Sequence, residues 1–369
     1  MVTPFEQGEA RGKAEKTAIQ HTLKELKRAA DFFDLEEGGM AKVEKESLKH
    51  IPGRYVEECE GLAKGSGLGE GPLLAVNFGR GLGRLFADGC TSFVVPQAHT
   101  PDGSVLLLKN RDLPYRRMHP QVCAYSRLDG YNEFLGVVSG GNVNWYQGVN
   151  EKGLVAFNNA ARGDPYEEGM PISVLVRRIL EECDSVDGAL KFIGGNAYNA
   201  FSNVFLADRE RAVVVEVKSG YPPHVWEIEN PDCRANHYLF HANPDADTKE
   251  EALRRLQTLT RYERGRQLLK GMEKVGVEDL QRLSRDHEQG PGSCSICRHA
   301  AFVGTPVEKL MSSSTLSAQI FRVGEEIETY VALGRPCQTE FVRLKYGQEI
   351  PGPLATGEAW LEDLKQKEG

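Results

Sequence analysis

The sequence has no long hydrophobic run and no block of basic residues, and we expect no secretory leader. Its apolar stretches fall short of the roughly 18–20 residues that cross a bilayer, and residues 1–7 have neither a basic start nor an apolar centre. The 45 basic and 53 acidic residues leave a net charge of -8, which argues against a nucleic-acid or anionic-membrane partner. We therefore expect a soluble, cytoplasmic protein.

Cysteine is present, but without the pattern of a disulfide framework or a zinc site. In a long cytoplasmic chain the thiols are expected to stay reduced. Cys294 and Cys297 form a C-x-x-C pair, and a zinc site of this type needs a second pair. Neither Cys233 nor Cys337 has a partner at such a spacing, so we expect no metal and no cofactor. The eight cysteines stand at positions 59, 90, 123, 183, 233, 294, 297 and 337.

The first 89 residues are predicted to form helices that end in a pliable linker. Apolar residues recur at intervals of three and four within 9–35, the spacing of an amphipathic helix. A second helix is expected over 43–63. Glycines are frequent over 65–72 and again over 79–83. Because they follow a helix and not a strand, they favour a flexible connection over a phosphate-binding loop.

After residue 90 the pattern changes to strands, then helices, strands, helices and strands again. This order differs from the alternation of strand and helix that builds a parallel sheet. It suits an α+β protein with two antiparallel sheets and helices packed outside them. The expected strands are 91–96, 105–109, 134–139, 143–149, 154–157, 201–207, 212–217, 315–323 and 328–333, and the later helices are 172–183, 186–193, 254–269 and 277–284.

Cys90 is the most informative residue for function. It lies between Gly89 and two hydroxyl residues, Thr91 and Ser92, a setting that suits a chain that cleaves itself. Cleavage before Cys90 would put a thiol nucleophile and a free α-amino base on one residue. Such an amine has a pKa of about 7.7–8.0, so it is partly neutral at working pH. The alternative interpretation is a buried cysteine after a turn glycine.

Four segments, taken in order, carry a resemblance to a known family: Asp88–Ser92, Asn110-Arg111-Asp112, Ala235-Asn236-His237 and Ser295–His299. Together they resemble the acyl-coenzyme A:6-aminopenicillanic acid acyltransferase family, the C45 group of N-terminal nucleophile (Ntn) hydrolases. The resemblance extends from about residue 5 to 342. It implies a four-layer αββα sandwich and a precursor that cleaves itself before Cys90. It divides the chain into a helical prosegment, 1–89, and a catalytic chain, 90–369, which together form one folded unit.

The resemblance also implies roles for individual residues. Cys90 would attack the Gly89 carbonyl through an N-to-S acyl shift and would later form a thioester with the substrate. Asn236 matches the family's oxyanion donor. Asp112 and Arg298 match a charged pair beside the nucleophile, where they would support the site geometry.

Other residues are weaker candidates. Thr91 and Ser92 are expected to donate hydrogen bonds during self-cleavage. Asn159 is a candidate substrate or second oxyanion contact, for which Asn158 competes. Two aromatic residues and two histidines complete the candidates: Trp145 and Tyr146 as pocket residues, and His237 and His299 as packing or hydrogen-bonding groups.

Lys109 is a departure from the related choloylglycine hydrolases, which carry an arginine at the matching position. This difference argues against a bile-salt-like specificity.

The sequence leaves several functions open. The resemblance favours an amide hydrolase that acts on an N-acyl amine or N-acyl amino acid through a Cys90 thioester. If an amine and not water resolves the thioester, the protein is an acyltransferase, with an acyl-coenzyme A as a candidate donor. One alternative is a non-catalytic small-molecule-binding protein with the same fold. Another is a conventional cysteine protease in which Cys90 works with His237 or His299.

Overall fold

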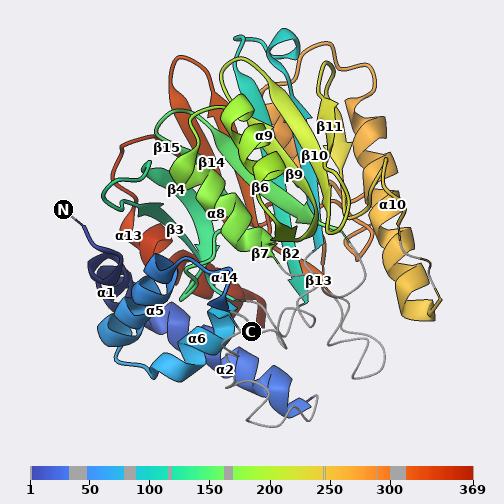
Figure 1. Cartoon of the computed structure of the whole chain (residues 1–369). Helices are drawn as coiled ribbons and strands as arrows, with labels where there is room; N and C mark the ends of the chain where they lie inside the picture. The colour runs from blue at the N-terminus through green and yellow to red at the C-terminus, as the bar shows by residue number, and fades with distance from the viewer. Residues whose placement is uncertain are drawn as a thin grey trace.

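The computed structural model describes residues 2–32, 48–78, 89–114, 119–161, 169–243, 245, 247–288, 290–299 and 313–368. Two antiparallel sheets dominate these residues, and helices lie on their outer faces (Figure 1). A short parallel pair, β7 (Met170–Pro171) with β8 (Tyr198–Asn199), stands apart from both. None of the described helices is long and apolar enough to cross a bilayer.

Sheet A has six strands in the order β12-β1-β2-β13-β14-β15. Strands β1 and β2 form the hairpin that the sequence predicts, with Gly103 of the connecting turn at a positive φ of 71°. All seven residues of β1 are buried. The strands are β1 (Gly89–Val95), β2 (Val105–Pro114), β12 (Asp232–Arg234), β13 (Ser313–Val323), β14 (Ile327–Leu333) and β15 (Val342–Lys345).

Sheet B has seven strands in the order β11-β10-β9-β6-β5-β4-β3. Its central strands carry runs of β-branched and aromatic residues with both faces buried. The strands are β3 (Gln121–Ser126), β4 (Phe134–Ser139), β5 (Gln147–Asn150), β6 (Val155–Ala160), β9 (Phe201–Ala207), β10 (Ala212–Lys218) and β11 (His224–Glu227).

Three hydrophobic clusters show how the layers stack. Between the sheets, Phe157 of sheet B stacks on Phe321 of sheet A with ring centroids 5.9 Å apart. A second cluster joins the outer face of sheet A to α10 (Lys249–Leu269) and α11 (Val277–Ser284). A third joins sheet B to α8 (Ile172–Glu182), α9 (Val186–Gly195) and the N-terminal helices. The order of layers is therefore αββα, and the predicted α+β class is confirmed.

The remaining helices lie near the chain ends. The N-terminal set gathers at one end of the sandwich, drawn in blue in Figure 1. It comprises α1 (Pro4–Ala14), α2 (Lys16–Phe32), α5 (Gly53–Ser66) and α6 (Glu70–Phe78). At the other end of the chain are α13 (Gly352–Thr356) and α14 (Glu358–Glu368), and a 3-10 turn, η1 (Gln97–His99), follows β1.

The N-terminal helices differ from the predicted ones in two ways. The single helix expected over 9–35 is two helices, because Glu15 ends α1 and its carboxylate accepts a hydrogen bond from the Gly141 backbone N–H. The linker expected over 65–72 is wrong for most of its length. Gly65 lies inside α5, where a Cβ atom would overlap the Glu9 carbonyl oxygen, so this glycine serves the close packing of α1 on α5. Residues 33–47 and 79–88 lie outside the described ranges.

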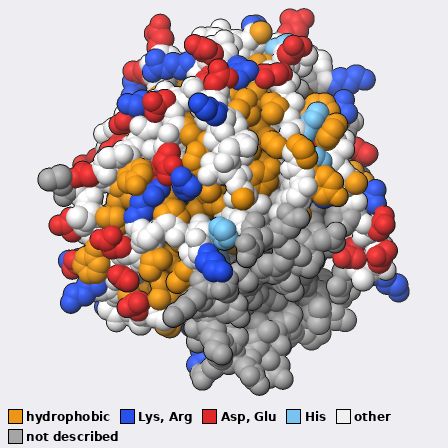
Figure 2. Space-filling view, in the orientation of Figure 1, with side chains coloured by type: hydrophobic (Ala, Val, Ile, Leu, Met, Phe, Trp, Pro, Cys, Tyr) orange, Lys and Arg blue, Asp and Glu red, His pale blue; other side chains and the backbone are white. Residues whose placement is uncertain are grey.

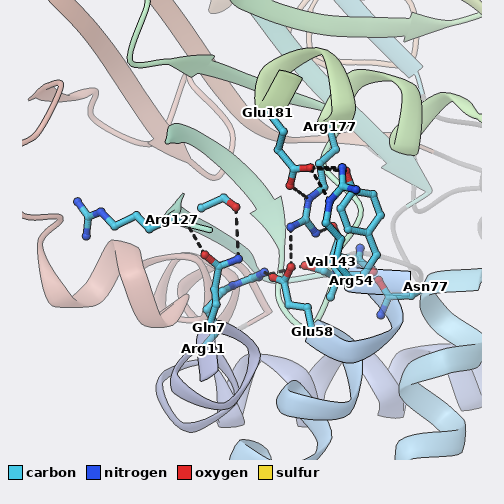
Figure 3. Close-up of polar contacts among 12 residues, drawn as sticks. Gln7, Arg11, Arg54, Glu58, Asn77, Arg127, Val143, Arg177 and Glu181 are labelled. Atoms are coloured by element: carbon cyan, nitrogen blue, oxygen red, sulfur yellow. Dashed lines mark hydrogen bonds and ion pairs between the residues drawn. The ribbon is translucent and has the colours of Figure 1, made fainter. Parts of the chain in front are cut away.

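A buried polar network attaches these helices to the sandwich (Figure 3). Glu58 of α5 accepts hydrogen bonds from Arg11 of α1, at 3.1 Å, and from Arg177 of α8, at 2.6 Å. Asn77 of α6 accepts from the Val143 N–H at 2.8 Å and donates to the Gly141 carbonyl at 3.0 Å. Residues before and after position 89 therefore share one interior.

Candidate active site

Strand pairing brings two of the sequence motifs to Cys90. In the β1–β2 ladder Gly89 faces Asp112, and Cys90 faces Arg111. On the other side of β1, Ser92 pairs with Arg234 of β12. Because the two strands run antiparallel, Asn236 follows β12 toward the level of Cys90. The hairpin register and the end of β12 thus place Asp112 and Asn236 on either side of one peptide bond.

Side-chain alternation along β1 decides which residues share a face with Cys90. Val94 belongs to the cluster between the sheets, whereas Phe93 and Val95 belong to the cluster under α10 and α11. Successive side chains of a strand point to opposite faces. Cys90 and Ser92 therefore face the interior between the sheets, and Thr91 faces the helices. Cys90 is buried, with 1% of its surface exposed.

Asn236 holds the backbone nitrogen of Cys90. Its Oδ1 accepts a hydrogen bond from the Cys90 N–H at 3.0 Å and another from Arg261 Nη2 at 2.8 Å. Its Nδ2 donates to the Ala160 carbonyl at 2.8 Å. Two donors on one side and an acceptor on the other fix the orientation of the amide. This asparagine thus orients the nitrogen of the Gly89–Cys90 peptide bond.

Arg261 is a site residue that the sequence analysis missed. It reaches down from α10 and donates from Nη1 to the Cys90 carbonyl at 2.6 Å and to Thr91 Oγ1 at 2.7 Å. Its side chain is buried, so these charge-assisted bonds form away from water. Within the sequence Arg261 is one of several arginines along an exposed-looking helix. No local motif marks it, because its role depends on how α10 packs on sheet A.

Arg298 and Asp112 lie close to each other, and their closest link is indirect. Arg298 Nη1 lies 3.8 Å from Asp112 Oδ2. Thr315 of β13 joins them more closely, since its hydroxyl donates to Asp112 Oδ1 at 2.7 Å and accepts from the Arg298 N–H at 2.8 Å. Burial lowers the pKa of Arg298 to about 10; the charge of Arg261 adds to this shift, and Asp112 opposes it.

Gly89 lies against this pair. A Cβ atom at position 89 would overlap Arg298 Nη1 and would lie 3.1 Å from Asp112 Oδ2. The residue before Cys90 therefore has no room for a side chain while the charged pair is in place. Ala87 and Asp88 lie outside the described residues.

Asn159, and not its neighbour Asn158, faces β1. Asn159 Oδ1 accepts from Ser92 Oγ at 2.8 Å, and its Nδ2 donates to the Arg234 carbonyl at 3.1 Å. Asn158 points to the opposite face of β6, where its Nδ2 donates to Ser202 Oγ at 3.0 Å. The two asparagines are therefore separated by strand alternation, and the one sharing the inter-sheet space with Cys90 is Asn159.

Two buried cations share this inter-sheet face. Lys109 is the cross-strand partner of Ser92, and its Nζ donates to the Tyr146 carbonyl at 3.2 Å. Arg111, opposite Cys90, donates to Gln121 Oε1 at 2.9 Å and lies 5.2 Å from the Tyr146 ring centroid. Tyr146 therefore lies beside the cross-strand neighbours of Ser92 and Cys90.

Trp145 is placed differently. It is fully buried against the edge of Phe134 and beneath Arg11, in the cluster shared with the N-terminal helices.

The two histidines lie in separate environments. His237 Nδ1 is 3.2 Å from Thr258 Oγ1. Burial, together with the positive charges of Arg261 and Arg234, lowers the pKa of His237 to about 4. His299 packs on His287, with the two Nε2 atoms 3.1 Å apart. Each histidine thus has a polar neighbour other than Cys90.

The site consists of Cys90, whose backbone nitrogen and carbonyl oxygen are held by different groups, and of Gly89 before it. Arg261 binds the Cys90 carbonyl, Asn236 binds its nitrogen, and Arg298 lies against Gly89. Buried guanidinium groups favour negative charge that develops nearby, on sulfur or on oxygen. Such an arrangement can stabilise an acyl transfer at a carbonyl carbon.

The fold and this site define an αββα protein built around an internal cysteine at the start of a central strand. The chain belongs to the acyl-coenzyme A:6-aminopenicillanic acid acyl-transferase family, whose sequence profile matches residues 99–306. The matched segment contains Asp112, Asn236 and Arg298 and begins after Cys90. Comparison with curated protein sequences gives no match.

Solved structures with similar coordinates include three enzymes. A variant of the conjugated bile acid hydrolase from Clostridium perfringens is 12% identical, with 71% of this chain and 93% of that chain covered and a TM-score of 0.46. The Caenorhabditis elegans ortholog of N-acylethanolamine-hydrolyzing acid amidase is 13% identical, with coverages of 63% and 92% and a TM-score of 0.41. Penicillin V acylase from Agrobacterium tumefaciens is 13% identical, with coverages of 70% and 87% and a TM-score of 0.44.

Proposed function

We propose that this protein is a self-processing N-terminal cysteine amidohydrolase or acyltransferase that works through a Cys90 thioester. The hydrogen bond from the Cys90 N–H to Asn236 Oδ1, at 3.0 Å, is the main support. The same nitrogen would become the α-amino group after cleavage. Asn236 would therefore keep the future base in position beside its own thiol.

Self-cleavage would begin with an N-to-S acyl shift. The Cys90 sulfur attacks the Gly89 carbonyl carbon, the carbon–nitrogen bond breaks, and the thiol proton ends on the nitrogen. Water then hydrolyses the thioester, which leaves a carboxylate on Gly89 and an α-amine and thiol on Cys90. Thr91 and Ser92 would support this step. Thr91 Oγ1 accepts a hydrogen bond from Arg261 Nη1, which also donates to the Cys90 carbonyl.

The mature site would repeat this chemistry on a substrate. The thiol attacks the acyl carbon of an N-acyl amine or N-acyl amino acid, and the α-amine takes the thiol proton. That proton passes to the departing amine as the thioester forms, and water hydrolyses the thioester. We propose Asn236 as the oxyanion donor and the Asp112–Arg298 pair as its support. Asn159 and Tyr146 are proposed substrate contacts from the inter-sheet face.

Trp145 is the least supported of the substrate contacts, because it packs among core residues beside Arg11.

The family description supports acyl transfer as a second outcome at the same site. It specifies an acyl-coenzyme A donor and an amine acceptor. In that case an amine, and not water, attacks the Cys90 thioester.

We also propose that residues 1–89 stay with residues 90–369 after cleavage. Glu58 of the prosegment and Arg177 of the catalytic chain have fully buried side chains. Separation of the two chains would expose both charges and the surrounding core.

The test is the intact mass of the purified protein under denaturing conditions, followed by N-terminal sequencing. Two fragments are expected, the larger beginning Cys-Thr-Ser, and Cys90→Ala should stay at 40.9 kDa. A Cys90→Ala protein that cleaves normally would rule out this residue as the self-cleaving one. Cleaved protein is then assayed on a panel of N-acyl amines and N-acyl amino acids, with and without an amine acceptor. If no panel member is turned over by the cleaved enzyme, the catalytic half of the proposal fails.

A further inference from the structure

A second cluster of reactive side chains lies beyond Arg298, outside the site described above. His287, Cys297, His299 and Cys337 each contribute one nitrogen or sulfur atom, and these four atoms all lie within 4.8 Å of one another. Cys297 is buried and the other three are half-buried. The sequence showed no second C-x-x-C pair for Cys294 and Cys297. The fold supplies two histidines and a distant cysteine instead.

Three distances from Nε2 of His299 are close to the edges of a small tetrahedron. Zinc bonds of about 2.3 Å to sulfur and 2.0–2.1 Å to nitrogen give tetrahedral edges of about 3.3–3.4 Å for nitrogen pairs and 3.6 Å for nitrogen–sulfur pairs. Here Nε2 of His287 lies 3.1 Å from Nε2 of His299. The latter atom lies 3.3 Å from Cys337 Sγ and 3.9 Å from Cys297 Sγ. These three distances lie within about 0.3 Å of the tetrahedral edges, and the other three are no longer than 4.8 Å.

We propose that these four side chains bind a zinc ion. Thiolate and imidazole together select zinc over calcium or magnesium, which prefer oxygen. Four protein ligands complete a tetrahedral shell and leave no position for water, so the ion is structural and not catalytic. Binding releases the two thiol protons to solvent and involves no redox change.

The ion would fasten the segment that carries Arg298. Cys297 and His299 flank this arginine, and His287 lies just after α11. Cys337 comes from the turn after β14. The zinc site would thus tie two chain segments together around the residue that lies against Gly89.

One neighbour adjusts when the metal binds. His299 Nδ1 lies 3.5 Å from Arg335 Nη1. An imidazole bound to zinc through Nε2 carries its proton on Nδ1, so it cannot accept from this guanidinium. Gln338 Oε1, 3.4 Å from the same Nη1, provides the alternative acceptor.

The experiment is a metal analysis of the full-length protein, purified under reducing conditions and dialysed against metal-free buffer. About one zinc ion per chain is expected. Cys337→Ser should lose most of the zinc. Cys294→Ser is the matched control. Cys294 forms the C-x-x-C pair with the proposed ligand Cys297 but is not itself a proposed ligand, so this variant should keep the zinc. Cys90→Ala should keep it as well, which separates this site from the nucleophile.

Cobalt provides a readout of the ligand set that does not need a folded variant. Wild-type protein reconstituted with Co²⁺ should show the intense visible d–d bands of a tetrahedral ion and a thiolate charge-transfer band. A wild-type protein that takes up neither metal overturns the proposal. So does a Cys297–Cys337 disulfide in freshly isolated, unreduced protein, or a Cys294→Ser variant that loses as much zinc as Cys337→Ser.

Discussion

Glu58 and Arg177 form an ion pair of which neither side chain has any exposed surface, with 2.6 Å between Oε2 and Nη2. Glu58 lies in the segment proposed to be cut free, and Arg177 lies on α8 of the catalytic chain. A charge buried without its partner is unfavourable by several kcal/mol. The pair therefore joins the two proposed chains more firmly than an exposed one could.

The first prediction concerns this pair. Glu58→Gln should lower the free energy of unfolding by about 3 kcal/mol, because it leaves the Arg177 charge buried beside one fewer carboxylate. Denaturant unfolding of the uncleaved Cys90→Ala protein measures this change without the complication of two chains. The control is Glu9→Gln, which removes the partner of the exposed Lys13 and should change stability by less than about 1 kcal/mol. Equal effects of the two substitutions would show that the buried pair contributes nothing special.

Arg261→Lys tests the residue found only in the structure. Lysine keeps the charge but cannot bind the Cys90 carbonyl, Thr91 and Asn236 at once. Self-cleavage should slow by about 10²-fold, the scale of losing one preorganised donor. The fraction of cut chain is followed by gel electrophoresis after synthesis in vitro. Arg264→Lys, on the same helix but paired with Asp286, should cleave at the wild-type rate.

Asn236→Ala should impair the mature enzyme more than the assembly of the fold. Loss of an oxyanion donor typically lowers the rate by about 10²–10³-fold, and the loss should appear in kcat more than in KM. Because Asn236 also holds the Cys90 nitrogen, we expect slower self-cleavage as well. Steady-state kinetics on chain that has been cleaved to completion separates the two effects. A near-normal kcat in such material would refute the oxyanion role.

Gly89→Ala introduces a methyl group where Arg298 lies. The Cβ atom would displace the guanidinium from Asp112, so the charged pair would no longer flank the peptide bond. We expect the variant to fold and to accumulate as uncut chain, as judged by intact mass. Gly103→Ala is not a suitable control, since its positive φ adds backbone strain of its own. Gly53, whose Cβ would meet nothing within 4 Å, is suitable, and Gly53→Ala should cleave normally.

His237 predicts a loss of stability in acid. Its pKa is lowered from 6.5 to about 4, first by burial and then by nearby arginines. Between these values the unfolded chain binds the proton and the folded chain does not, so the free energy of unfolding falls as the pH drops from 6.5 to 4. The shift corresponds to about 3 kcal/mol. In His237→Asn, which keeps an acceptor for Thr258, this part of the pH dependence should disappear. Unfolding curves at pH 7 and pH 4.5 give the free energy of unfolding of both proteins. If it falls by the same amount in both between these pH values, the assignment is wrong.

The hairpin of β1 and β2 shows what the sequence could predict. Two short runs rich in strand-forming residues and a Pro-Asp-Gly turn are local signals of a hairpin. In the structure this hairpin brings Gly89 opposite Asp112. The two helices around residues 172–193 and the hairpin of β9 and β10 were predictable for the same reason. The α+β class followed from the order of such elements.

Contacts that depend on packing left no such signal. Arg261 acts through the placement of α10 over sheet A, and the histidines and cysteines of the proposed zinc site come from segments 38 residues apart. The prediction that Gly65 belongs to a linker is wrong for a related reason. Glycine inside a helix is usually destabilising, but here its missing side chain lets α5 pack closely on α1.

The order of strands in sheet A has a consequence for protein synthesis. β1 and β2 emerge early from the ribosome, whereas β13, which pairs with β2 and carries Thr315, emerges near the end. Arg261 and Arg298 also follow long after Cys90. On the proposed mechanism, a nascent chain would carry the thiol for most of its synthesis without the groups needed to use it. Completion of translation would then time the first cut, and an unfinished chain would remain chemically inert.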